Sequence, residues 1–105
     1  MNRMKRIYIS GAITGLPRNE YMERFSNVER ELIKRGYNVC NPTKLLPAKH
    51  LWVYKLIGYK LTLLYDLWYL MKCDGICMIK GWSKSKGARL ERAVAHIFNI
   101  ELIKL

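Results

Sequence analysis

The sequence predicts an α/β fold with one parallel sheet of four strands and helices on both faces of the sheet. Short apolar runs of strand character alternate with helical patterns along the chain, in the order strand–helix–strand–helix–strand–helix–strand. The third strand-like run, residues 75–79, is apolar throughout, as expected for a parallel strand that is covered on both faces. With 105 residues, half of them apolar, the chain is expected to form a single Rossmann- or flavodoxin-like domain over residues 1–105.

The first half of the chain has the pattern strand–helix–strand. Residues 5–10 combine β-branched and aromatic side chains and open into a turn of small residues. Residues 19–35 have helical periodicity, and Gly36 is suited to end that helix. Residues 37–40 are predicted to form a short second strand. The apolar stripe of the helix is expected to comprise Tyr21, Phe25, Val28, Leu32 and Ile33.

The second half continues with helix, strand, helix and strand. Residues 43–51 are predicted to form a loop, and a helix is expected to run from there to about Lys72. The strand at 75–79 is followed by a loop, a helix over residues 88–98 and a last strand over residues 100–103.

The segment 51–71 approaches a membrane span in length and apolarity. Lys55, Lys60 and Asp66 interrupt it, and each would cost roughly 2.5–3.5 kcal/mol near the centre of a bilayer. We therefore expect no membrane span but a helix that is buried or faces another subunit, in a homodimer or a higher homo-oligomer.

Charge and cysteine content narrow the class of protein. The chain carries 19 basic and 8 acidic residues, a formal net charge of +11, which favours phosphate-bearing partners such as nucleotides, nucleic acid or acidic lipid. A surface that is basic only for solubility is the alternative. The three cysteines form no CxxC pair and no zinc pattern, so we expect buried, reduced thiols, no metal and no cofactor. The first six residues lead directly into a strand, so no signal peptide and a cytoplasmic location are expected.

The last predicted helix carries a carboxylate on its apolar side. A buried charge is costly unless it is paired or used in chemistry, and the start of a helix favours an anion. Glu91 is therefore either a functional group or the partner of a nearby Lys or Arg. By helical spacing, the residues that share its face are Gly87, Leu90, Val94, Ile97 and Phe98.

Asp66 repeats this pattern in the preceding helix. It is the only charged residue within the range 61–71. One interpretation places it on a solvated edge of the helix near Lys60 or Lys72. The other pairs it with Glu91, because two neighbouring carboxyl groups are typical of glycosyl transfer chemistry.

Ligands of parallel sheets bind beyond the carboxyl ends of the strands, which selects the loops 11–15 and 81–87. The second loop contains Ser85 and Gly87 just before a helix start, where backbone N–H groups can hold phosphate. Simple capping of the helix by a serine is the alternative. The first loop matches neither GxGxxG nor a P-loop, but it permits close backbone approach and offers the Thr14 hydroxyl. An ordinary strand-to-helix turn is the alternative there.

Several pieces of the chain occur together, in order and at compatible spacings, in a known family. They are residues 8–15 (YISGAITG), 40–42 (CNP), Asp66, 73–76 (CDGI) and 81–91. With these pieces the chain resembles the nucleoside 2-deoxyribosyltransferase-like superfamily, and in particular its short members that begin with a strand and YISGAITG. The resemblance spans nearly the whole chain.

The resemblance implies a role for each candidate residue. Glu91 matches the nucleophile that attacks the anomeric carbon of the sugar and releases the base. Asp66 matches the acid that orients the substrate and assists proton transfer, and Tyr8 matches the tyrosine that positions the nucleophile. The residues that match the loop lining the sugar and the phosphate are Gly11, Ala12, Ile13 and Thr14, and those that match the phosphate-holding pair of related deoxynucleoside 5′-monophosphate hydrolases are Ser85 and Gly87.

The activity that follows is hydrolysis or exchange at the N-glycosidic bond of a (deoxy)nucleoside or its 5′-monophosphate, through a covalent glycosyl-Glu91 intermediate. The acidic residue that some transferases carry before the nucleophile is absent from this chain, where Ser83-Lys84-Ser85 stands. The last strand is also expected to end the chain, whereas family enzymes often continue. A non-catalytic nucleotide-binding module and, ranked below it, a basic nucleic-acid-binding protein therefore remain alternatives.

Overall fold

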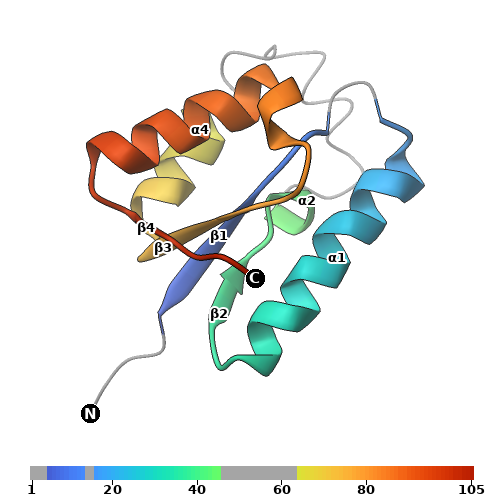
Figure 1. The fold of residues 1–105 in the computed structure, drawn as a ribbon, viewed down its shortest axis with the longest axis horizontal. Coiled ribbons are helices and arrows are strands. Elements are labelled where there is room, and N and C mark those ends of the chain that lie inside the picture. Colours follow the sequence, from blue (N-terminus) through green and yellow to red (C-terminus); the bar gives the residue numbers. More distant parts are fainter. Residues whose placement is uncertain (1–4, 14–15, 46–63) are drawn as a thin grey trace.

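The computed structural model describes residues 5–13, 16–45 and 64–105 (Figure 1). In chain order the elements are β1 (Arg6–Ser10), α1 (Arg18–Lys34), β2 (Asn38–Cys40), α2 (Pro42–Leu45), β3 (Gly75–Met78), the short 3-10 helix η1 (Trp82–Lys84), α4 (Lys86–Ile97) and β4 (Glu101–Leu102). Residues 64–71 are also helical. The four strands are parallel and lie in the order β2-β1-β3-β4. Helix α1 covers one face of the sheet, and α4 covers the other together with the helix of residues 64–71, which confirms the predicted α/β fold (Figure 1).

Strand β1 lies at the centre of the sheet and is paired on both sides. Its register pairs Tyr8 with Cys40 of β2 and with Ile76 of β3. Side chains of a strand alternate between the two faces of the sheet. The odd positions, Ile7 and Ile9, therefore pack towards α1, whereas Tyr8 and the other even positions point towards α4.

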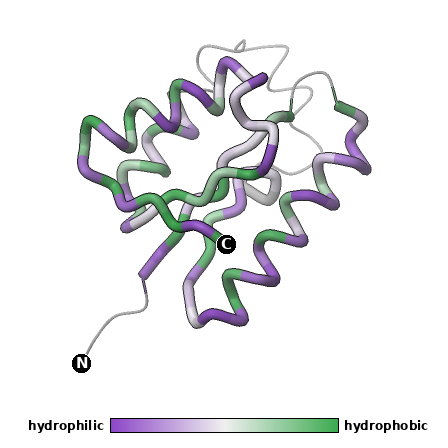
Figure 2. Tube along the Cα trace, viewed as in Figure 1, coloured by the Kyte–Doolittle hydropathy of each residue, from purple (hydrophilic) through white to green (hydrophobic). Residues whose placement is uncertain are grey.

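The α1 face of the sheet is closed by a mainly apolar cluster, although α1 also buries Glu29. Phe25 and Leu32 of α1 are buried against Ile7 and Ile9. Hydrophobic colouring follows the central strands in Figure 2, whereas α1 alternates along its length between hydrophilic and hydrophobic residues. The predicted stripe is wrong at one position, because Ile33 is 57% exposed. It lies about 100° around the helix from Leu32, beyond the arc that contacts the sheet.

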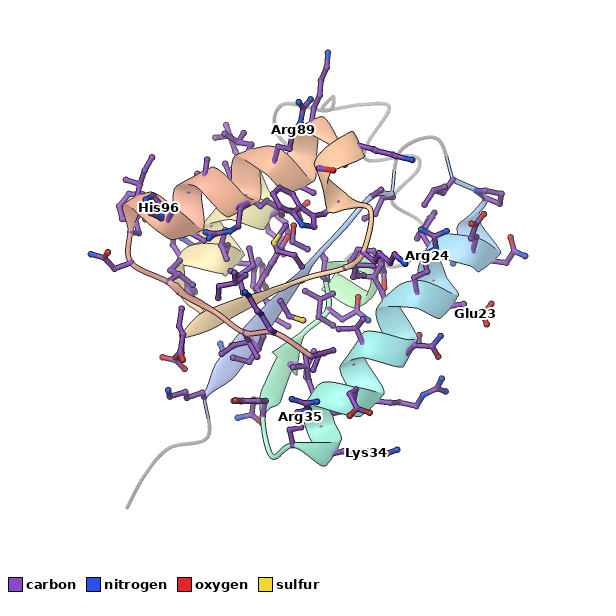
Figure 3. The ribbon with its side chains drawn as sticks, in the orientation of Figure 1. Glu23, Arg24, Lys34, Arg35, Arg89 and His96 are labelled. Carbon is purple, nitrogen blue, oxygen red and sulfur yellow. The ribbon has the colours of Figure 1, made fainter. Side chains whose placement is uncertain are left out.

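The outer surfaces of the two long helices are charged, as their amphipathic patterns predict. Glu23, Arg24 and Lys34 project from α1, and Arg89 and His96 project from the outer side of α4 (Figure 3). These side chains point away from the sheet, so none of them contributes to a site at its centre.

The segment after β2 differs from the prediction. Residues Pro42–Leu45 form the short helix α2, where a loop was expected from residue 43 onwards. The side chain of Asn41 explains this start, since its Oδ1 accepts hydrogen bonds from the backbone N–H of Thr43 at 3.0 Å and from the Thr43 hydroxyl at 2.6 Å. The predicted helix before residue 64, with most of the apolar segment 51–71, lies outside the described residues. Among the described helices, none is both long enough and apolar enough to cross a membrane.

The neighbouring residues Leu32 and Ile33 give a direct test of this packing. Leu32→Ala is expected to lower the free energy of unfolding by about 2–5 kcal/mol, because it leaves a cavity in a closed core. Ile33→Ala removes a largely exposed side chain from the same turn of α1 and is expected to cost under about 1 kcal/mol. Urea unfolding followed by circular dichroism measures both values. Equal losses for the two variants would contradict the arrangement of α1 on the sheet.

Candidate active site

The polar centre of the molecule lies between β1 and α4. Tyr8 and Ser10 come from consecutive inward positions of β1, and Glu91 comes from the second turn of α4. All three side chains are buried. Residues from the two ends of the sequence therefore meet in one place on the α4 face of the sheet.

Both oxygens of the Glu91 carboxylate accept hydrogen bonds from strand β1. The Tyr8 hydroxyl donates to Oε2, and the Ser10 hydroxyl donates to Oε1 at 2.7 Å. The side chain of Glu91 is only 6% exposed. Among the residues that the structure describes, no Lys or Arg forms an ion pair with it. Within this described part of the chain, the carboxylate is thus held by two neutral hydroxyls.

The buried face of helix α4, which contains Glu91, is narrower than the sequence predicted. Ala88, Glu91 and Ala95 are its buried residues. Leu90, Ile97 and Phe98 are 41%, 70% and 56% exposed, so their predicted place on the buried face is wrong. The two alanines explain the difference, because their short side chains allow the helix to approach the sheet closely and leave the flanking positions outside.

The environment of Glu91 disfavours its charged form. Burial raises the pKa of Glu91 above its usual value, while the hydrogen bonds from Tyr8 and Ser10 act in the opposite direction. Burial also raises the pKa of Tyr8 well above its usual value, and the negative charge of Glu91 adds to this effect. Tyr8 therefore stays protonated and acts as a hydrogen-bond donor.

Asp66 is the second acid of this region. It lies in the helix of residues 64–71, on the same face of the sheet as α4. Its Oδ1 atom is buried and has no hydrogen-bond partner among the described residues. Burial raises the pKa of Asp66 to about 7, and the charge of Glu91 contributes in the same direction. The two carboxyl groups are thus electrostatically coupled, and Asp66 exchanges its proton near neutral pH.

The described part of the loop after β1, residues 11–13, packs against the rest of the fold. Gly11 is buried, and a Cβ atom at this position would lie 2.9 Å from Cβ of Ile79. Only glycine therefore allows the loop to pass β3 this closely. Ala12 is half-buried, and Ile13 packs against the apolar cluster on the α1 face. Thr14, which was expected to line the sugar and phosphate region, lies outside the described residues.

The second predicted loop leads into α4. Ser85 is the N-cap of this helix, and its Oγ accepts a hydrogen bond from the backbone N–H of Ala88 at 3.2 Å. Gly87 is half-buried in the first turn, where it follows the exposed Lys86 and precedes the buried Ala88. The other N–H groups of a first turn have no partner within the helix, so this start can receive an anion beside its cap.

Two cysteines, Cys40 and Cys73, pack in the same buried cluster as Tyr8. Cys40, Cys73 and Cys77 are buried free thiols, as predicted. Within residues 5–13, 16–45 and 64–105, no group of three or more His, Cys, Asp or Glu could hold a metal ion.

Sequence reasoning missed Ser10. Ser10 is the last residue of the predicted strand 5–10 and adjoins the turn of small residues, and it is not among the predicted site residues. The period of the strand offered the signal, because Ser10 stands two positions after Tyr8 and must point to the same face.

The two hydroxyl donors can be tested one at a time. Ser10→Ala removes a hydrogen bond to the charged form of Glu91, so the pKa of Glu91 should rise further. Carboxyl carbon shifts in an NMR pH titration measure this value. Ser83→Ala, in the exposed part of η1, is the matched control and should leave it unchanged. A pKa that stays constant or falls in Ser10→Ala would contradict the described contact.

The raised pKa of Asp66 makes stability depend on pH. The unfolded chain loses this proton near its usual value of 3.8, but the folded chain loses it only near 7. Asp66 therefore makes its full contribution to the free energy of unfolding below about pH 4. This contribution, up to about 4 kcal/mol, is lost as the pH rises to about 7. Urea unfolding between pH 4 and 8 should show this slope in the wild type and a flatter one in Asp66→Asn.

The control for this experiment is Glu101→Gln, which removes an exposed carboxylate that pairs with Lys5 at 3.1 Å. It should keep the slope of the wild type. An equal slope in Asp66→Asn and the wild type would show that Asp66 titrates normally.

Comparison with known proteins identifies the family to which the chain belongs. No curated protein matches the chain. A family described as "Domain of unknown function (DUF4406)" matches residues 5–104, which include every described element of the sheet and the site. The chain therefore belongs to the DUF4406 family.

Proposed function

We propose that the protein breaks the N-glycosidic bond of a (deoxy)nucleoside or its 5′-monophosphate, with Glu91 as the nucleophile. One observation carries this proposal: a buried carboxylate is held by two hydroxyls, with no Lys or Arg of the described residues paired to it, on the same face as a second acid whose pKa is about 7. Pairs of acids with separated protonation behaviour are typical of glycosidic chemistry.

The hydrogen bonds to Glu91 suit a nucleophile. Each carboxylate oxygen has two lone pairs and accepts one hydrogen bond from β1, so a lone pair remains on each oxygen. The two donors also fix the rotation of the carboxylate, which reduces the entropy lost on reaching the attacking geometry. Glu91 would attack C1′ of the sugar, the bond from C1′ to the base would break, and its electron pair would leave with the base.

Asp66 supplies the proton in this scheme. With a pKa of about 7 it is still substantially protonated at neutral pH, so it can protonate the departing base. The ionised Asp66 can then take a proton from a water molecule that attacks C1′ of the glycosyl ester. This second step releases the sugar and restores both acids. A free base as acceptor would instead give exchange.

The start of α4 favours a 5′-phosphate on the substrate. Ser85 uses its oxygen as the helix cap, but its hydroxyl proton and the N–H groups of the first turn remain available to phosphate oxygens. The exposed Lys84 and Lys86 flank this position and add positive charge. Deoxynucleoside 5′-monophosphates are therefore the first substrates to try.

The direct test measures release of free base by chromatography from a panel of deoxynucleosides and their 5′-monophosphates. Glu91→Gln should lower the rate at least about 1,000-fold, because it removes the nucleophile while keeping its shape. Glu101→Gln removes a carboxylate of the same type at an exposed site and should retain the activity of the wild type. A 2-fluoro-substituted substrate should leave a glycosyl group on the peptide that contains Glu91, detectable by mass spectrometry.

Two results would count against the proposal. Equal base release by Glu91→Gln and the wild type would remove Glu91 from the chemistry. Calorimetric binding of a nucleotide by the wild type without base release from any panel member would favour the non-catalytic binding module.

A further inference from the structure

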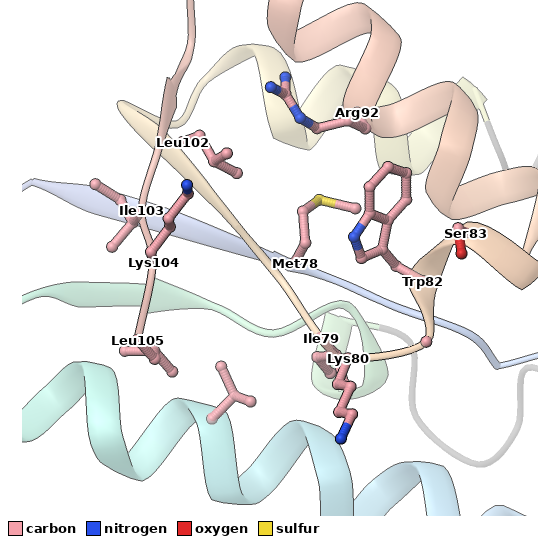
Figure 4. A pocket seen from close by; sticks show the side chains of 12 residues that line it. Met78, Ile79, Lys80, Trp82, Ser83, Arg92, Leu102, Ile103, Lys104 and Leu105 are labelled. Carbon is pink, nitrogen blue, oxygen red and sulfur yellow. The ribbon is translucent and has the colours of Figure 1, made fainter.

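A concave surface lies at the edge of the sheet near β4, away from the contacts of Glu91. Strand β4 pairs with β3 only at Gly75 and Ile76, and the last contact of the ladder is the bond from the Ile103 N–H to the Ile76 carbonyl at 2.8 Å. Beyond this point the two segments separate and enclose a groove of about 610 Å³ (Figure 4). Residues 78–83 form one wall, and residues 102–105 form the other.

The groove is basic. Lys80, Arg92 and Lys104 line it, and none of its lining residues is acidic. Within the described part of the chain, these three cations take part in no ion pair. They come from three different segments: the turn after β3, helix α4 and the segment after β4 (Figure 4). The groove therefore presents several separate positive charges to one ligand, in a chain with a net charge of +11.

One aromatic ring lies among these charges. Gly81 has a φ of +89°, a left-handed conformation that reverses the chain after β3, and the Trp82 N–H donates to the Ile79 carbonyl at 3.1 Å. This turn brings the half-buried indole of Trp82 beside Met78, with Arg92 near it (Figure 4). An indole at the edge of a basic groove can stack on a nucleobase.

We infer that this groove binds single-stranded nucleic acid, with a base stacked on Trp82 and the phosphates of the strand neutralised by Lys80, Arg92 and Lys104. Cations spread over three segments suit successive phosphates along a strand better than the single phosphate of a mononucleotide. The inference does not depend on the chemistry of Glu91, because no contact of Glu91 lies in the groove.

Fluorescence anisotropy with a labelled 12-nucleotide oligothymidylate tests the inference on the full chain. The triple variant Lys80→Gln, Arg92→Gln, Lys104→Gln should raise Kd at least tenfold at 100 mM salt and reduce the slope of log K against log salt by about 2. The matched control Arg18→Gln, Lys34→Gln, Arg89→Gln loses the same formal charge at exposed positions and should change Kd less than threefold.

Variants of Trp82 test the stacking of a base independently of the charges. Trp82→Ala should weaken binding about tenfold through loss of stacking, and Trp82→Phe should recover most of it. Glu91→Gln should bind the oligonucleotide as the wild type does, whatever its effect on base release. Thermal unfolding of each variant shows that the fold is retained.

Several outcomes would overturn the inference. Absence of binding at low salt would exclude a nucleic-acid site, and equal weakening by the two triple variants would show a diffuse basic surface. Displacement of the strand by thymidine 5′-monophosphate, at equal nucleotide concentration, would show a mononucleotide site. Dissociation of a dimer by the groove variant, seen by sedimentation, would show that a second copy of the chain occupies the groove.

Discussion

The carboxylate of Glu91 is buried against β1 and held there by the hydroxyls of Tyr8 and Ser10. Taking an anion out of water is costly, and two neutral donors recover only part of this cost. The part of this cost that is not recovered disfavours the charged forms of the acids. The pKa of Glu91 is therefore raised, and the pKa of Asp66 reaches about 7. Stability must therefore come from elsewhere, and the closed apolar packing of Ile7 and Ile9 on the opposite face of β1 supplies it.

The geometry of the sheet makes this contact possible. β1 is paired on both sides, so its alternation is rigid, and consecutive even positions must face α4. Ala88 and Ala95 bring the helix close enough for Glu91 to reach both hydroxyls. Gly11 then lets the chain leave β1 past Ile79 without a clash. Small residues thus control the position of a charged one.

The order of the elements and the two unusual acids were predictable from sequence, because hydrophobic periodicity and a charge in an apolar run are local signals. The role of Ser10 was not predictable, since it depends on which face of β1 meets α4. The exposure of Ile33 and Phe98 was also missed, because periodicity gives the direction of an apolar face but not the width of the contact. Helix α2 depends on a side-chain cap at Asn41 that a loop-like composition conceals.

The hydroxyl donors and their acceptor are far apart in the chain: Tyr8 and Glu91 by 83 positions, Ser10 and Glu91 by 81. During synthesis on the ribosome, β1 leaves the exit tunnel well before α4 has been translated. A nascent chain therefore carries the two strand hydroxyls without the carboxylate that they orient. Any chemistry that depends on Glu91 would therefore require that the last helix has been made and has docked on the sheet.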